Sequence, residues 1–269
     1  MSPHNGILPL YFGPRDRSLF GCYHKPRLER SGKCAVVICQ PLGHEYINCH
    51  RALRQLAARL ADAGFPVLRF DYYGCGDSSG ETEDGTISGW LEDVSTALAE
   101  VRRRTGIDQT CVVGLRLGAT LALMSGALRG EIERLVLWNP VIDGKTYLEE
   151  LLSLQKEMLC FRPRPKTRQK PEDYIEVLGF PLSNLLCDQL RALDLLRLLQ
   201  RPAHNVLMLE SYPVPFGDTL RNHLSQSEAR LEYQVIEATP IWLPTSDGSL
   251  HVPFQALQAA VSWISKAYS

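Results

Sequence analysis

Three residues near the middle of the chain decide what chemistry it can perform. Gly114 and Gly118 flank Arg116 in the pattern G-x-R-x-G, which differs from the G-x-S-x-G turn of many serine enzymes only at its centre. In that turn the glycines let a strand and a helix pack where a Cβ atom would clash. An apolar run at 110–113 precedes the pattern and a helical run at 119–128 follows it, as the turn requires.

An arginine at the central position changes the chemistry. Its guanidinium stays protonated, so Arg116 cannot act as a nucleophile or as a general base, and serine-type acyl transfer at this position is excluded. A buried cation on a strained turn needs a partner. That partner is either an anionic ligand group, which an arginine fork binds through two hydrogen bonds, or an internal carboxylate. The internal candidates are Glu45, Asp77, Asp143 and Asp218.

Composition limits the class of protein. The chain has 269 residues, 45% hydrophobic content and a formal net charge of -1, which suits one large α/β domain and gives no electrostatic basis for binding nucleic acid. It has no signal-like N-terminus and no run of about 18 apolar residues, so we expect a soluble, cytoplasmic protein without a membrane partner. Its eight cysteines form no C-x-x-C pair; we expect reduced core residues, no metal and no other cofactor.

Alternating strand and helix patterns predict a mostly parallel sheet covered on both faces. The first two strands flank a Gly-Pro-Arg-Asp-Arg turn, so we expect an antiparallel hairpin at the sheet edge. The predicted strands are 7–12, 18–24, 34–39, 66–71, 110–113, 134–138, 205–210 and 231–237. The predicted helices of the core are 49–63, a run that ends at 104, 119–128 and 254–267.

The alternation stops between 141 and 201. Helical patterns at 147–159 and 182–199 flank a basic, proline-rich run at 161–171, which is either a solvated loop or an anion site. We expect this insertion to form a helical cap, because ligands of open α/β sheets bind at the carboxyl ends of the strands. The predicted division is a core of residues 1–140 and 202–269 and a cap of residues 141–201.

Three motifs resemble those of one protein superfamily. They are the runs 40–45, QPLGHE, after one buried strand, 70–80, FDYYGCGDSSG, after the next, and the turn at 114–118. Together they resemble the α/β-hydrolases, in the serine-aminopeptidase-like and thioesterase-like branch. The runs 114–120 and 177–182 further resemble hydrolase-like proteins associated with exosortase systems. The resemblance implies an α/β-hydrolase fold with the hairpin and cap predicted above.

The resemblance also implies an oxyanion hole made of backbone N–H groups. One would come from Leu42, or its neighbour Gly43, in the loop after the first buried strand. The other would come from Leu117, which follows the central residue of the turn. Backbone donors survive side-chain substitution, so this hole can persist although Arg116 replaces the serine.

The remaining triad positions depart from the superfamily pattern. The acid would follow the strand at 205–210, where the register falls on Val214, and the nearest carboxylates are Glu210 and Asp218. Asp218 also precedes a helical run and is equally typical of a helix N-cap. The base position, before the last helix, holds His251, which either points inward or lies on the surface.

Other residues could supply acid–base or nucleophilic chemistry. His44 and Glu45 on the presumed oxyanion loop form either a second acid–base pair or a hydrogen-bonded structural pair. Cys75 and Ser78 lie on a glycine-rich loop and are the alternative nucleophiles, although a catalytic thiol needs a lowered pKa and a nearby base.

Three functions follow. The first is a non-hydrolytic enzyme that moves a proton next to a carbonyl, with Arg116 holding an anionic group of a small-molecule or peptidyl substrate and His251, His44 or Glu45 moving the proton. The second is an inactive pseudohydrolase that binds such a ligand; a closed cap, a filled pocket and an internally paired Arg116 favour it, whereas an open pocket faced by both Arg116 and His251 favours the enzyme. The third is an esterase, thioesterase or peptidase with a substitute nucleophile. The sequence does not specify an oligomeric state.

Overall fold

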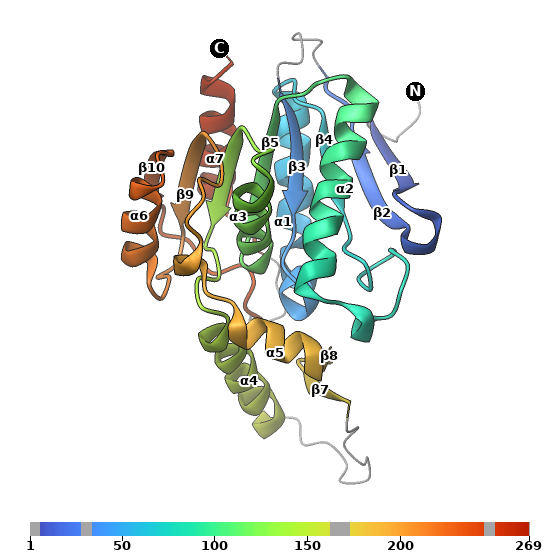
Figure 1. Cartoon of the computed structure of the whole chain (residues 1–269), viewed down its shortest axis with the longest axis vertical. Helices are drawn as coiled ribbons and strands as arrows, with labels where there is room; N and C mark the ends of the chain where they lie inside the picture. The colour runs from blue at the N-terminus through green and yellow to red at the C-terminus, as the bar shows by residue number, and fades with distance from the viewer. Residues whose placement is uncertain (1–5, 28–33, 162–172, 245–250, 269) are drawn as a thin grey trace.

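A sheet of eight strands forms the centre of the molecule, with helices on both faces (Figure 1). The computed structural model describes residues 6–27, 34–161, 173–244 and 251–268. In order across the sheet, the strands are β1 (Ile7–Phe12), β2 (Leu19–His24), β4 (Val67–Phe70), β3 (Ala35–Cys39), β5 (Thr110–Leu115), β6 (Arg134–Trp138), β9 (Asn205–Glu210) and β10 (Arg230–Val235).

Six of these strands are parallel, and the β1–β2 hairpin is antiparallel and occupies one edge, which confirms the predicted sheet. The helices are α1 (Gly43–Asp62), α2 (Ile87–Thr105), α3 (Leu117–Arg129), α4 (Gly144–Phe161), α5 (Asn184–Ala192), α6 (Gly217–Gln226) and α7 (Phe254–Lys266). None of the helices within the described ranges is long and apolar enough to cross a membrane.

Two apolar cores lie on opposite faces of the sheet. Val37 of β3 belongs to the core beneath α2 and α3, whereas its neighbour Val36 belongs to the core beneath α1 and α7. Successive residues of a strand point to opposite faces, so a strand covered on both sides is apolar throughout. All five residues of β3 are buried for this reason.

One helix begins earlier than its apolar periodicity indicates. The predicted start was 49, but α1 begins at Gly43, so His44 and Glu45 lie in its first turn and not on a loop. Gly43 has a φ of 54°, and a glycine in that conformation is typical of a turn. The expectation of a loop was therefore wrong, and both side chains are held by a helix.

In the segment between β6 and β9, the described elements from α4 to α5 lie beyond the carboxyl ends of the parallel strands (Figure 1). This segment contains α4, the two-stranded hairpin of β7 (Tyr174–Val177) and β8 (Phe180–Ser183), and α5. The helix predicted at 182–199 is present but shorter, because Ser183 belongs to β8 and caps α5 by accepting a hydrogen bond from Leu186 N, and the chain becomes extended at Leu193 after α5 ends. The basic run predicted at 161–171 lies, beyond Phe161, outside the described residues.

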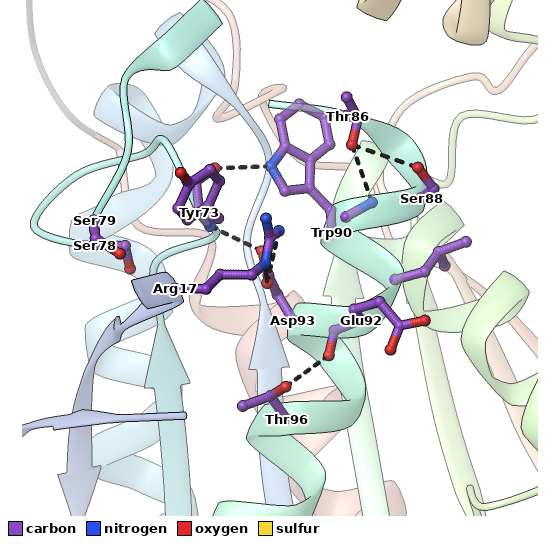
Figure 2. Close-up of polar contacts among 12 residues, drawn as sticks. Arg17, Tyr73, Ser78, Ser79, Thr86, Ser88, Trp90, Glu92, Asp93 and Thr96 are labelled. Carbon is purple, nitrogen blue, oxygen red and sulfur yellow. Dashed lines mark hydrogen bonds and ion pairs between the residues drawn. The ribbon is translucent and has the colours of Figure 1, made fainter. Parts of the chain in front are cut away.

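The loop after β4 is fixed to α2 by a buried carboxylate (Figure 2). Asp93 accepts hydrogen bonds from Tyr73 N at 2.8 Å and Arg17 Nε at 3.1 Å. The indole of Trp90 donates to Tyr73 O at 3.0 Å, and Thr86 caps α2. Arg17 lies between β1 and β2, so this network ties the edge hairpin, the loop and α2 together.

Candidate functional site

The strand-to-helix turn predicted from the two glycines is present. Arg116 joins β5 to α3 with φ 54° and ψ -125°, a conformation that costs a residue with a side chain about 1–3 kcal/mol. A Cβ atom on Gly114 would overlap the backbone of Ala119, and one on Gly118 would overlap the carbonyl of Cys39. Glycine is therefore required on both sides of Arg116.

Two carboxylates pair with the Arg116 side chain. Its Nε donates to Glu45 Oε1 at 2.8 Å, and its Nη2 donates to Glu150 Oε2 at 2.7 Å. Glu45 comes from the first turn of α1 and Glu150 from α4. Arg116 is only 5% exposed and Glu45 3%, so the pair between them is shielded from water.

Aromatic rings complete the surroundings of the guanidinium. The carbon at its centre lies 5.3 Å from the ring centroid of Tyr147 and 5.0 Å from that of Trp242, distances typical of cation–π contacts. The hydroxyl of Tyr147 donates to Glu45 Oε2 at 2.8 Å. Trp242 reaches the site from the connection between β10 and α7 and is buried. We refer to Glu45, Arg116, Tyr147 and Glu150 as the Arg116 cluster.

Opposing effects set the protonation of this cluster. Burial and the negative charge of Glu150 raise the pKa of Glu45, and together they outweigh the positive charge of Arg116 and the hydrogen bonds from Arg116 and Tyr147, which lower it. Burial alone lowers the pKa of Arg116, but the negative charges of Glu45 and Glu150 outweigh it and raise that pKa. With both carboxylates ionised the cluster carries a formal charge of -1. Arg116 is thus fully compensated within the protein.

Of the four internal partners considered for Arg116, only Glu45 is bonded to it. Asp143 instead accepts a hydrogen bond from Thr146 N at 2.7 Å. The second partner, Glu150, was not identified from the sequence. Tyr147 and Glu150 are three residues apart on a helix and therefore share one face. This spacing is the sequence feature that could have pointed to Glu150 as a site residue.

The two predicted oxyanion positions meet in one pocket. Leu42 is the N-cap of α1 and Leu117 is the first residue of α3, and both line a pocket of about 400 Å³, its open mouth included. N–H groups at the start of a helix have no carbonyl partner within that helix. The rest of the lining is mainly apolar and comes largely from the β6–β9 segment: Tyr147, Leu151, Val177, Leu178, Phe180, Leu182, Leu186 and Leu190, with Gly43 and His44 from α1.

His44 lines this pocket, and one of its ring nitrogens is held by Asn48. The Nδ2 atom of Asn48 lies 3.1 Å from His44 Nδ1 and donates to the carbonyl of Trp242 at 2.9 Å. That second bond requires the amide nitrogen of Asn48 on this side, so Nδ1 accepts and Nε2 carries the proton. Burial lowers the pKa of His44, which favours the neutral ring with its proton on Nε2.

The other two predicted triad residues do not join Arg116. Asp218 is 82% exposed at its side chain and pairs with Arg221 at 3.0 Å. It is not an N-cap either, because α6 begins at Gly217 and Phe216 holds the capping position. His251 is exposed just before α7. Neither residue is among the described residues that line the two pockets beside Arg116.

The alternative nucleophiles are not activated. Burial, followed by the charges of Asp71 and Asp93, raises the pKa of the Cys75 thiol to about 12, and the thiol rather than the thiolate then dominates at neutral pH. Ser78 Oγ donates to the carbonyl of Asp71 at 2.6 Å and accepts from Phe20 N at 2.8 Å. The serine therefore holds the loop against β2.

A turn of this kind after the middle strand of a mostly parallel sheet, with an antiparallel hairpin at one edge, defines an α/β-hydrolase fold. Residues 33–176, more than half of the chain, match the model of the serine aminopeptidase (S33) family. The chain belongs to this family, and the hydrolase superfamily expected from the sequence motifs is confirmed. Comparison with curated protein sequences gives no match.

Solved structures with the same fold include several hydrolases. Est1E from Butyrivibrio proteoclasticus, with ferulic acid bound, has a TM-score of 0.69 at 16% identity, and the match covers 96% of this chain and 98% of that one. An esterase of Pyrococcus furiosus has a TM-score of 0.66 at 13% identity, with 98% and 91% covered. Proline iminopeptidase of Mycobacterium smegmatis has a TM-score of 0.64 at 13% identity, with 97% of each chain covered. At these identities the likeness shows the fold alone.

Proposed function

We propose that this protein is a ligand-binding member of the hydrolase fold that does not transfer an acyl group through residue 116. The observation that carries the proposal is the pairing of Arg116 with Glu45 and Glu150 at 2.8 and 2.7 Å. An arginine that anchors an anionic substrate uses its positive charge to bind that anion. Here its charge is already compensated, which supports the pseudohydrolase among the predicted functions.

The surroundings of the pocket support binding over proton transfer. An enzyme that removes a proton next to a carbonyl needs a base within hydrogen-bond reach of its ligand. His44 offers a donor on that side, and Glu45 already accepts from Arg116 and Tyr147. Asp218 and His251 lie outside the lining. Among the described residues that line this pocket, donors without an unpaired carboxylate suit a carbonyl that is held and not converted.

The ligand we propose is an apolar chain that ends in a carbonyl group. Its oxygen would accept hydrogen bonds from the N–H groups of Leu42 and Leu117 and from His44 Nε2–H. Its chain would pack on the leucines of α4 and α5, such as Leu151 and Leu190. Burying apolar surface contributes about 25 cal/mol per Å² and would supply most of the affinity.

We further propose that the β6–β9 segment acts as a cap over this pocket. Phe180 of β8 packs against Gly43, as shown by the position of a hypothetical Cβ atom on Gly43, which would lie 3.4 Å from the Phe180 ring. The cap would thus contact the core at the presumed oxyanion position.

A pair of adjacent substitutions tests the pocket. Leu186 is buried and lines the pocket, whereas Leu185 is 58% exposed on the same helix. Isothermal titration calorimetry with methyl octanoate should show binding to the wild type, weakened at least about tenfold by Leu186→Phe because the added ring fills ligand space. Leu185→Phe, the matched control, should bind like the wild type. Equal affinity of all three proteins, or no binding by the wild type, would contradict the proposal.

A further inference from the structure

We infer that Glu150 sets the charge selectivity of the pocket: its carboxylate occupies the place at Arg116 that a ligand carboxylate would take, so the protein accepts uncharged acyl derivatives such as esters and rejects the free acids. This inference rests on the proposed function. It names the class of ligand and the residue that selects it.

The Arg116 cluster adjoins the ligand pocket. Tyr147 lines both the apolar pocket and the smaller cleft that contains Arg116 and Glu150. Leu117, the proposed donor to the ligand carbonyl, follows Arg116 directly in the chain. A head group bound at Leu117 therefore lies next to the cluster and experiences its charge.

The charges around that head group disfavour a second carboxylate. Glu45 and Glu150 outnumber Arg116, and the described residues that line the apolar pocket include no lysine or arginine. The N-termini of α1 and α3 favour partial negative charge on a carbonyl oxygen. A full negative charge would also meet the uncompensated charge of the cluster in a partly buried site, where screening by salt is weak.

Glu150 is the replaceable carboxylate of the two. Glu45 accepts from both Arg116 and Tyr147 and is buried. The Glu150 side chain is 36% exposed, and its carboxylate bonds Arg116 alone among the contacts of the described residues. Removing the charge at Glu150 would leave Arg116 Nη2 without an anion while Glu45 still holds Nε.

The test compares octanoic acid with methyl octanoate at pH 8, where the acid is ionised. Isothermal titration calorimetry on the wild type should give an ester affinity at least about tenfold above that of the acid. Repulsion between the ligand carboxylate and one uncompensated negative charge nearby is large enough to produce a tenfold difference in affinity. Glu150→Gln should reduce this ratio at least about fivefold. Glu157→Gln makes the same change at an exposed position of α4 and should leave the ratio unchanged.

The outcomes separate the two proposals. Equal binding of acid and ester by the wild type overturns the charge selectivity but leaves the proposed function standing. A ratio that Glu150→Gln leaves intact overturns the role of Glu150. Absence of binding of either compound overturns the proposed function and the selectivity with it. The wild-type ratio alone decides the first point if Glu150→Gln does not fold, which far-ultraviolet circular dichroism would reveal.

Discussion

Arg116 and Glu45, 71 positions apart in the chain, form a buried ion pair with Nε 2.8 Å from Oε1. The pair joins the turn that usually carries a nucleophile to the helix that follows the presumed oxyanion loop. A cation at position 116 would be costly without it, since an isolated buried charge is strongly disfavoured. The arginine and the glutamate therefore belong together as one structural unit.

Removing the charge of Glu45 should destabilise the protein strongly. Glu45→Gln leaves Arg116 buried with only the half-exposed Glu150 as a counter-charge, and breaking a buried pair costs about 3–5 kcal/mol. Urea unfolding followed by tryptophan fluorescence would measure the loss in the free energy of unfolding.

A double substitution provides the control for this effect. Replacing both partners, as Glu45→Leu with Arg116→Leu, leaves no unpaired charge and should be less destabilising than the sum of the two single changes by at least about 1 kcal/mol. Additive losses would show that the two side chains are not coupled.

Gly118→Ala should cost at least about 3 kcal/mol, because the new methyl group meets the backbone carbonyls of Cys39 and Gln40, which cannot move aside as a side chain can. Gly130→Ala is the comparison: it has a φ of 66° but no atom within 4 Å of the added carbon, so it bears only the strain of about 1 kcal/mol. Thermal unfolding of both variants gives the difference. Similar melting temperatures would mean that the close approach of β3 to α3 is not as described.

Restoring the serine should not restore hydrolysis. Arg116→Ser supplies a hydroxyl, but Val214 stands at the acid register, and Trp242 of the β10–α7 connection contacts residue 116. Activity towards p-nitrophenyl octanoate should stay at the buffer rate, since an unactivated serine is a weak nucleophile. This prediction would be refuted if a fluorophosphonate labelled the serine introduced at position 116 and the variant released p-nitrophenolate in a burst.

His24 should make stability depend on pH. Burial, then the charges of Arg69 and Arg54, lowers the pKa of His24 to about 4, against about 6.5 in the unfolded chain. Between these values the unfolded chain binds a proton that the folded protein does not, so the free energy of unfolding falls as pH falls from about 6.5 to about 4, with a slope of up to about 1.4 kcal/mol per pH unit. Urea titrations in that window should show a shallower slope for His24→Asn. An unchanged slope would mean that His24 is protonated in the folded state.

The sequence predicts the sheet well because its parallel strands are buried on both faces. Runs such as 35–39 have no polar residues, and strand limits at Arg134 and Asn205 agree with the structure. The glycine pair at 114 and 118 likewise indicates the turn, since the steric requirement is local. The buried strands and the glycine turn are determined by residues that are close together in the chain, so the sequence can predict them.

The site was less predictable because its partners come from distant segments. No local pattern brings Glu150 and Trp242 to Arg116, because Glu150 depends on how α4 packs on the core and Trp242 on the course of the β10–α7 connection. The helix expected at 182–199 is shortened at both ends: Ser183 caps it at the start, and the backbone becomes extended at Leu193 and Asp194 after its last residue, Ala192. The family pattern gives only the sequence positions at which triad residues are expected, and a position does not fix where its side chain lies. Neither Asp218 nor His251 is among the described residues that line the pocket.

The central claim is that the pocket holds a carbonyl ligand without cleaving it. The direct measurement is to incubate the protein with an equimolar amount of methyl octanoate, at concentrations where calorimetry shows the pocket to be occupied, and to follow the ligand by mass spectrometry. We expect the ester to disappear no faster with the protein than it does by spontaneous hydrolysis in buffer. The account would be contradicted if the wild type released octanoic acid faster than buffer does, while the Leu186→Phe variant, with its pocket blocked, did not.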